Sequence, residues 1–204
     1  QYGLPLARMM KERFGTDYVY SRKPYQPDSI EEWYQEVAAA LNIDLSAEVA
    51  DLKKKTEALQ EKARAALSGM TCVVFGTSGR PFDLAHLLAN IGVEPKAMLL
   101  QTILPEDWPD IKSLLNAGVD PIVFQGDNSL QNEELLEELS PDISIGAFER
   151  SSLARMGIRP VVLLTSNYLI GFESTLEVLR LLMERTPGIE ALIYKEKILA
   201  SGEC

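Results

Sequence analysis

The sequence has few side chains that bind metals or form disulfides. Among its 204 residues there are two cysteines, Cys72 and Cys204, and one histidine, His86. One cysteine lies in an apolar run and the other is the last residue, which is not a disulfide framework. The motifs G-x-S-x-G, H-E-x-x-H and C-x-x-C are absent, so the sequence does not support an α/β-hydrolase, a zinc protease or a dithiol oxidoreductase.

Positive charge and long apolar runs are also scarce. Twenty basic and thirty acidic side chains give a net charge of -10, which repels the phosphates of nucleic acids. No apolar run approaches the roughly 20 residues that a membrane helix needs. The opening residues, QYGLPLARMM, have neither the charged head nor the apolar middle of a signal peptide. We therefore expect a cytoplasmic protein with neither nucleic acid nor a membrane as partner.

From Met70 onward, short apolar runs alternate with amphipathic ones, which is typical of βαβ units. The short runs are apolar almost throughout, as in strands covered by helices on both faces. The pattern predicts an α/β fold, with a Rossmann-like, doubly wound, parallel five-stranded sheet. The predicted strands are 71–75, 97–101, 121–124, 143–146 and 161–165, and the predicted helices are 82–91, 106–116, 132–139, 149–156 and 172–185. The tail after Gly188 fits either a strand or a helix.

The residues before Met70 have helical patterns. Apolar side chains at helical spacing predict a helix over 4–14 that ends at Gly15, followed by a short strand at 17–21. Ser29 and Glu32 form a capping box, which predicts a helix from there to Leu41. An amphipathic pattern predicts a further helix over 46–68, roughly 30 Å long and suited to bridging two domains. We therefore expect residues 1–68 to be the end of a preceding α/β domain plus a bridging helix, and residues 69–204 to be a Rossmann-like domain. Because Gln1 opens into a helical run, we expect a fragment of a longer chain.

The stretch FGTSGRPFD follows the first predicted strand and raises the question of an anion site. A glycine turn at the amino end of a helix directs main-chain N–H groups toward an anion, and Arg80 adds positive charge. The G-x-G-x-x-G spacing and the Lys-Ser/Thr end of a P-loop are both missing. Pro81 in the first helical turn explains the turn without a ligand, so the stretch favours a structural role.

Ligands of open parallel sheets bind beyond the carboxyl ends of the strands. We therefore expect any site in the loops that follow the predicted strands, which are 76–81, 102–105, 125–130, 146–149 and 165–171. No catalytic residue stands out. The candidate ligand-binding residues are Gly76, Thr77, Ser78, Gly79, Arg80, Gly126, Tyr168 and Gly171.

Metal ligands are not expected. Cys72 lies in a buried-type strand, where a free thiol acts as a small hydrophobic side chain. His86 lies beside the apolar stripe of its predicted helix, which indicates a boundary residue rather than a ligand. The glutamates of NEELLEEL, 132–139, fall on the solvent face of a helix whose leucines point inward.

Several longer phrases occur in a recognisable order. They are KERFGTDYVY, a long charged helix leading into a strand and glycine turn, FDLAHLLANIGVEPKAM, EELSPDISIGAFERSSLARMGIRPVVL and YLIGFESTLEVLRLLME. Together they resemble the nitrogenase component 1 type oxidoreductase family over nearly the whole chain. The resemblance implies a subunit of three Rossmann-like domains. It also implies electron transfer from an ATP-dependent iron–sulfur reductase to a substrate or metallocofactor held between domains, and a homologous subunit as partner in a hetero- or homo-oligomer.

The sequence departs from the family pattern at the positions whose side chains bind metal clusters in that family. Nitrogenases place a histidine in the loop that matches roughly 164–171, and in that neighbourhood this chain has Leu163, Leu164, Thr165 and Ser166. A family cysteine before the first helix would fall at or before Gln1. We therefore expect no cofactor on these residues alone and no catalysis by them alone, with an iron–sulfur or larger cluster in the full-length complex. Two alternatives stay open: a non-catalytic scaffold that binds a metal-cluster precursor or tetrapyrrole during cofactor assembly, and a free-standing Rossmann-like ligand-binding domain.

Overall fold

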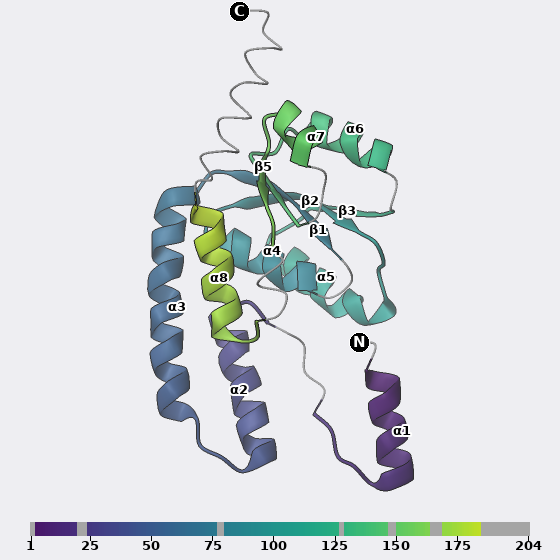
Figure 1. Cartoon of the computed structure of the whole chain (residues 1–204), viewed down its shortest axis with the longest axis vertical. Helices are drawn as coiled ribbons and strands as arrows, with labels where there is room; N and C mark the ends of the chain where they lie inside the picture. The colour runs from purple at the N-terminus through teal and green to yellow at the C-terminus, as the bar shows by residue number, and fades with distance from the viewer. Residues whose placement is uncertain are drawn as a thin grey trace, which may run out of the picture.

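The computed structural model describes residues 3–19, 24–76, 80–126, 129–146, 150–163 and 169–184. Figure 1 shows a sheet covered by helices, with a pair of long helices beside it and the first helix set apart. Among the described helices, none is both long enough and apolar enough to cross a membrane.

The sheet has five parallel strands in the order β3-β2-β1-β4-β5. This confirms the predicted α/β class and the parallel five-stranded sheet. The strands are β1 (Thr71–Gly76), β2 (Glu94–Leu100), β3 (Ile122–Gln125), β4 (Ile143–Ile145) and β5 (Arg159–Val161).

The last strand differs most from its predicted range of 161–165, because β5 runs from Arg159 to Val161 and residues 162 and 163 are not in a strand. Residues 164 and 165 lie outside the described ranges. It pairs only with the three-residue β4, from Ile143↔Arg159 to Ile145↔Val161. The ladder begins early because the Arg159 N–H donates to the Asp142 carbonyl at 3.0 Å. The length of β5 is therefore set by its neighbour rather than by its own apolar run.

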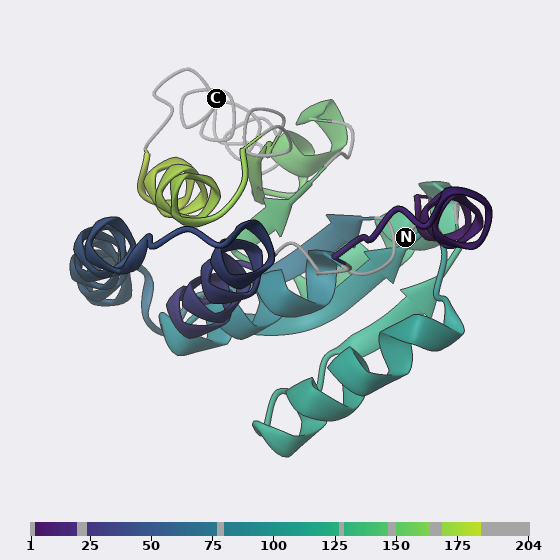
Figure 2. The same ribbon diagram turned by 90° about the horizontal axis from the view of Figure 1, so that it is seen from below.

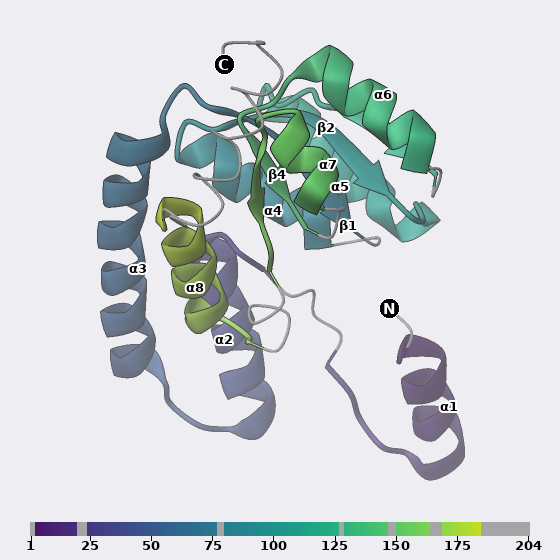
Figure 3. The same cartoon turned by 45° about the horizontal axis from the view of Figure 1, so that its top comes forward.

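Helices lie on both faces of the sheet (Figures 2 and 3). Successive side chains of a strand point to opposite faces. Val74 belongs to a buried cluster with Leu87 of α4 (Arg80–Asn90) and Leu179 of α8 (Phe172–Met183), whereas Val73 belongs to another with Leu136 of α6 (Ser129–Leu139). This is the doubly wound arrangement that the sequence predicts. The helices of this part are α4 (Arg80–Asn90), α5 (Trp108–Asn116) after the 3₁₀ turn η1 (Pro105–Asp107), α6 (Ser129–Leu139), α7 (Arg150–Arg155) and α8 (Phe172–Met183).

Three helices precede the sheet: α1 (Leu4–Phe14), α2 (Pro27–Leu41) and α3 (Ser46–Leu67). The capping-box prediction at Ser29 is wrong, because α2 begins at Pro27 and Gln26 caps it without a side-chain hydrogen bond. Proline suits the first helical position, since its φ is fixed and its missing N–H would have had no helical partner. The strand expected at 17–21 is not formed over 17–19, and residues 20 and 21 lie outside the described ranges.

The helix α3 packs beside α2 and α8 (Figures 1 and 3). Its buried residues Ala63 and Leu67 share a cluster with Val178 of α8. Lys53 of α3 forms ion pairs with Asp28 and Glu31 of α2, at 2.6 and 2.8 Å. These contacts fix the two helices to each other and to α8, while the domain boundary at Gly69 stays a prediction.

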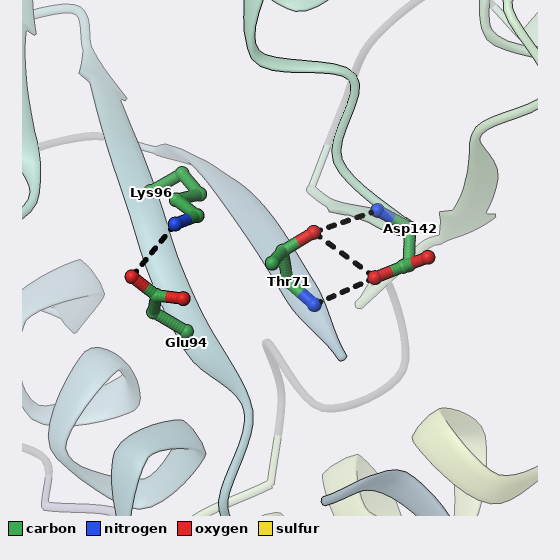
Figure 4. Close-up of polar contacts among 4 residues, drawn as sticks. All are labelled: Thr71, Glu94, Lys96 and Asp142. Atoms are coloured by element: carbon green, nitrogen blue, oxygen red, sulfur yellow. Dashed lines mark hydrogen bonds and ion pairs between the residues drawn. The ribbon is translucent and has the colours of Figure 1, made fainter. Parts of the chain in front are cut away.

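Side-chain hydrogen bonds join the amino ends of β1 and β4 (Figure 4). The main-chain N–H and the hydroxyl of Thr71 on β1 donate to Asp142 Oδ2 at 2.8 and 3.0 Å. The Asp142 N–H donates back to Thr71 Oγ1 at 3.1 Å. On the neighbouring β2, Lys96 pairs with Glu94 at 2.8 Å. The bonds between Thr71 and Asp142 hold β1 to β4 at the edge opposite the one where ligands of such sheets bind.

Candidate functional site at the carboxyl edge of the sheet

The strand order reverses between β1 and β4. From β1 the chain continues to β2 and β3 on one side, and β4 and β5 then add on the other. A doubly wound sheet opens a crevice beyond the carboxyl ends of its strands at such a reversal. Gly76 ends β1 and Gly146 follows β4, so these two residues are the described ones that lie at the reversal. The loop residues 77–79 and 147–149 lie outside the described ranges.

Gly146 allows β1 and β4 to approach closely at this point. Its φ is +113°, and a Cβ on it would lie 2.5 Å from the main-chain oxygen of Phe75. Its N–H donates to the Val161 carbonyl at 2.9 Å, which ties β4 to β5. From the sequence, Gly146 is predicted only as part of the loop 146–149. The local signal is a glycine immediately after the apolar run ISI.

Gly76 has a structural reason to be glycine. A Cβ there would lie 2.6 Å from Cγ of Pro81, the second residue of α4. The carbonyl of Gly76 accepts a hydrogen bond from the Gln101 N–H at 3.0 Å. Both contacts support the structural role of the GTSGRP turn. Of the other candidates in this turn, Arg80 is the first residue of α4, and Thr77, Ser78 and Gly79 lie outside the described ranges.

Gly126 lies at the same edge of the sheet. Its N–H donates to the Leu100 carbonyl at 3.1 Å, one residue before the Gln101 that bonds to Gly76. The end of β2 therefore brings Gly76 and Gly126 to one edge. Gln101, Thr102 and Gln125 are exposed here. These amide and hydroxyl groups are uncharged donors and acceptors, which suit hydrogen bonding to a ligand better than soft-metal ligation.

Gly171 lies against α2. It precedes α8 with φ +68° and ψ -147°, and a Cβ on it would lie 2.6 Å from Oη of Tyr34. The Tyr34 ring stacks on Phe172, with centroids 5.7 Å apart. Burial, and secondarily Glu173, raises the pKa of the Tyr34 phenol. The remaining candidate, Tyr168, lies outside the described ranges.

The described side chains do not fit an iron–sulfur cluster, which is held by thiolates. Cys72 is fully buried in β1, and burial, with a smaller effect of Glu94, raises the pKa of its thiol. His86 is half-buried on α4. Nowhere in the described ranges do three His, Cys, Asp or Glu side chains gather as a metal site would require. Cys204 lies outside these ranges.

Two hollows lie away from the carboxyl edge. One, of about 280 Å³, lies between the carboxyl-terminal ends of α6 and α7 and is lined by Glu133, Arg155 and Met156. There Ser152 donates to Glu133 at 2.6 Å and accepts from Arg155 at 2.9 Å, so these polar groups join the two helices. The other, also about 280 Å³, lies in the α2–α3 hairpin.

Comparison with known proteins identifies the family. The sequence model of the nitrogenase component 1 type oxidoreductases matches residues 1–186. The chain belongs to this family. Among curated proteins, none matches it.

Solved nitrogenase structures have the same fold as this nitrogenase component 1 type chain. It matches "Nitrogenase Cp1 at pH 6.5" with a TM-score of 0.73 and 15% identity, over 97% of this chain and 44% of that one. It matches "Nitrogenase Cp1 at pH 5" with a TM-score of 0.65 and 16% identity, over 96% of this chain and 46% of that one. The chain therefore spans less than half the length of these structures. The resemblance carried by the ordered phrases is confirmed.

Proposed function

We propose that this chain is one α/β unit of a longer nitrogenase component 1 type subunit. In this proposal the subunit receives electrons from an ATP-dependent iron–sulfur reductase and delivers them to a substrate or metallocofactor held between domains. It works in the cytoplasm as an oligomer with a homologous subunit. The family match over residues 1–186 carries the proposal, and the coverage of less than half of each nitrogenase structure supports a longer subunit.

Within that subunit, the carboxyl edge of this sheet serves as one wall of the interdomain site. The close approach of β1 and β4 at Gly146 holds the wall rigid. Gln101, Thr102 and Gln125 offer neutral hydrogen-bonding groups that orient a ligand. Because the only described thiol, Cys72, is buried and held protonated, cluster ligands come from polypeptide outside the described ranges.

The test is anaerobic purification of the complete polypeptide with its partners, followed by metal analysis and electron-uptake assays with the reductase. We expect stoichiometric iron and electron uptake that depends on ATP. An iron-free protein that binds a tetrapyrrole or a cluster precursor without turnover would instead establish the scaffold alternative.

Single substitutions at the carboxyl edge of the sheet test whether this edge is a wall of the interdomain site. We expect Gln101→Ala and Gln125→Ala to lower turnover while leaving the iron content unchanged, because they remove ligand contacts and no cluster ligand. Gln131→Ala is the matched control, since Gln131 is exposed on α6. Equal turnover in all three variants would contradict the proposal that this edge of the sheet contacts the ligand. It would not contradict the proposal that the subunit transfers electrons.

A further inference from the structure

The two outer strands of the sheet differ in how open they are to further pairing. The strand β5 contains Pro160, which has no N–H, and its Arg159 side chain donates to the Glu184 carbonyl at 3.2 Å. The strand β3 contains neither proline nor a charged residue, and it pairs with β2 without a register shift. Proline, charge, bulges and covering segments are what usually keeps an edge strand from pairing with another chain. Within the described ranges, β3 is therefore the unprotected edge of the sheet.

Half of the main-chain groups of β3 point away from β2. The Gly126 N–H donates to the Leu100 carbonyl of β2, and successive residues of a strand direct their main-chain groups to alternate sides. Phe124, two residues earlier, thus bonds toward β2, whereas the N–H and C=O groups of Val123 and Gln125 point to the open side. A second strand can pair with such a row of groups.

The helix α5 presents an apolar stripe on the side of this open edge. Trp108, Ile111 and Leu115 recur at i, i+3 and i+7, and Trp108 and Leu115 are 56% and 49% exposed. One flank of α5 packs beside α4, so the exposed stripe lies on the other flank, toward the edge that β3 forms. Ile111 and Val123 of β3 pack against the same buried cluster, which places the middle of the α5 stripe beside the middle of that strand.

The main chain of β3 is complementary to a second copy of itself. A two-fold axis midway between two Phe124 residues, perpendicular to the sheet, sets two β3 strands side by side in antiparallel order. Val123 of each copy then exchanges two main-chain hydrogen bonds with Gln125 of the other, and the two Phe124 side chains form a cross-strand aromatic pair. Since β3 has no charged side chain, no like charges face each other within this pair of strands.

The same axis brings the two α5 stripes together. The helix α5 covers both β2 and β3, because its buried Leu114 belongs to a cluster with Leu100 and Val123. With neighbouring strands ~4.8 Å apart, the two copies of α5 lie roughly 10 Å apart on one face of the joined sheet, which is the usual distance between packed helices. They run in opposite directions, so Trp108 of each copy meets Leu115 of the other. Tryptophan at such a central contact contributes strongly to association.

We propose that two copies of this chain associate through their β3 edges in antiparallel order, which joins two five-stranded sheets into one and packs the α5 stripes against each other. The inference rests on the proposed function only in expecting an oligomer, for which it names the surface and the partner. Its test measures self-association rather than iron or electron uptake, so the two proposals can fail separately.

Sedimentation of the 204-residue chain over a range of concentrations measures the association. We expect a monomer–dimer equilibrium that Trp108→Glu/Leu115→Glu abolishes, because the axis places the new carboxylates opposite each other. The matched control is Ser113→Glu/Asn116→Glu, which adds the same charge at exposed positions on the other sides of α5 and should leave the dimer unchanged. A wild-type chain that stays monomeric up to its solubility limit, or a dimer that resists Trp108→Glu/Leu115→Glu, overturns the proposal.

Two further measurements locate the contact and do not depend on the folding of the charged variant. In Trp33→Phe, Trp108 is the only tryptophan, and its fluorescence should shift to shorter wavelength as the chain dimerises. The amides of Val123 and Gln125 should exchange with solvent more slowly at high than at low concentration. A dimer in which both observables stay unchanged uses another surface and overturns the proposal. A chain that is monomeric alone but binds a homologous subunit through Trp108 would assign the surface to that subunit instead.

Discussion

The carboxylate of Asp83 on α4 accepts a hydrogen bond from the main-chain N–H of Tyr25, and a second from that of Gln26 at 3.3 Å. On the other side of the same segment, the Thr175 hydroxyl of α8 donates to the Tyr25 carbonyl at 2.8 Å. Asn90 donates to the Gln26 side chain at 2.9 Å. The segment that leads into α2 is therefore held between α4 and α8, which joins the α2–α3 hairpin to the sheet.

This contact predicts a pH dependence of stability. Burial raises the pKa of Asp83, and the two main-chain N–H groups, with a smaller effect of His86, oppose this only in part. The folded protein thus binds the Asp83 proton more tightly than the unfolded chain does. The stability that this proton contributes is complete when the pH is below 3.8, the ordinary pKa of an aspartate. It is lost as the pH rises through the raised pKa that Asp83 has in the folded protein.

The substitution Asp83→Asn removes this titration and keeps an acceptor for the N–H groups. We expect the free energy of unfolding of the wild type, relative to Asp83→Asn, to fall as the pH rises from 4 toward neutrality. Urea unfolding at several pH values measures it. Asp120→Asn, an exposed change, is the control and should follow the wild-type profile. Parallel profiles for the wild type and Asp83→Asn would show that Asp83 does not titrate differently on folding.

Gly171 is predicted to be intolerant of a side chain. Gly118 is the matched control, because it also has a positive φ, +75°, but nothing within 4 Å of an added Cβ. We expect Gly118→Ala to cost about 1–2 kcal/mol of stability from backbone strain alone. Gly171→Ala should cost more, since its ψ of -147° at positive φ is a region that essentially only glycine adopts and since its Cβ meets Tyr34 Oη; Tyr34→Phe should recover only the part that is due to the Oη contact. Equal costs at the two glycines by chemical denaturation contradict the contact.

The turn after β1 can be tested for its structural role. Gly76→Ala should destabilise the fold by about 1–3 kcal/mol, as overpacking does. Adding Pro81→Ala should recover most of that loss, because the Pro81 ring is the group that the new methyl meets. If Gly76→Ala leaves stability unchanged while weakening ligand binding in the complete protein, Gly76 serves a ligand instead.

The thiol of Cys72 is predicted to be unreactive in the folded protein. It is fully buried, and a raised pKa keeps it protonated. In a Cys204→Ser background, we expect no reaction with a thiol reagent such as DTNB at pH 8 over minutes, and one equivalent after denaturation in guanidinium. Rapid reaction of the native variant would show that β1 opens or that the thiol is accessible.

The order and type of the elements after Met70 could be predicted because their signals are local. Buried parallel strands are apolar along their whole length, and each predicted strand overlaps an observed one. Most glutamates of α6 follow the same logic, since Leu136 is buried and Glu134, Glu137 and Glu138 are exposed. Glu133 does not, because it is half-buried and accepts a hydrogen bond from Ser152 of α7. Strand ends were less predictable, because β5 takes its length from pairing with β4.

The candidate site could be predicted only as a set of loops. Gly146 is required by a main-chain oxygen of Phe75 on another strand, and Gly171 by a side chain of α2. Neither requirement is visible in the neighbouring sequence. The start of α2 is a different case, because Pro27 carried the local signal and the Ser29 capping box competed with it. Contacts between distant segments therefore explain most of what the sequence did not predict.

The most direct test of the central claim, that this unit supplies a wall of the site but no cluster ligands, is anaerobic reconstitution of the 204-residue chain with iron and sulfide. A [4Fe–4S] cluster usually needs about four thiolates, and about two even when it is shared between two subunits. The chain has only Cys72, which is buried, and Cys204. We predict a colourless protein without thiolate-to-iron absorption after desalting; a stable, stoichiometric cluster on this chain would contradict the account.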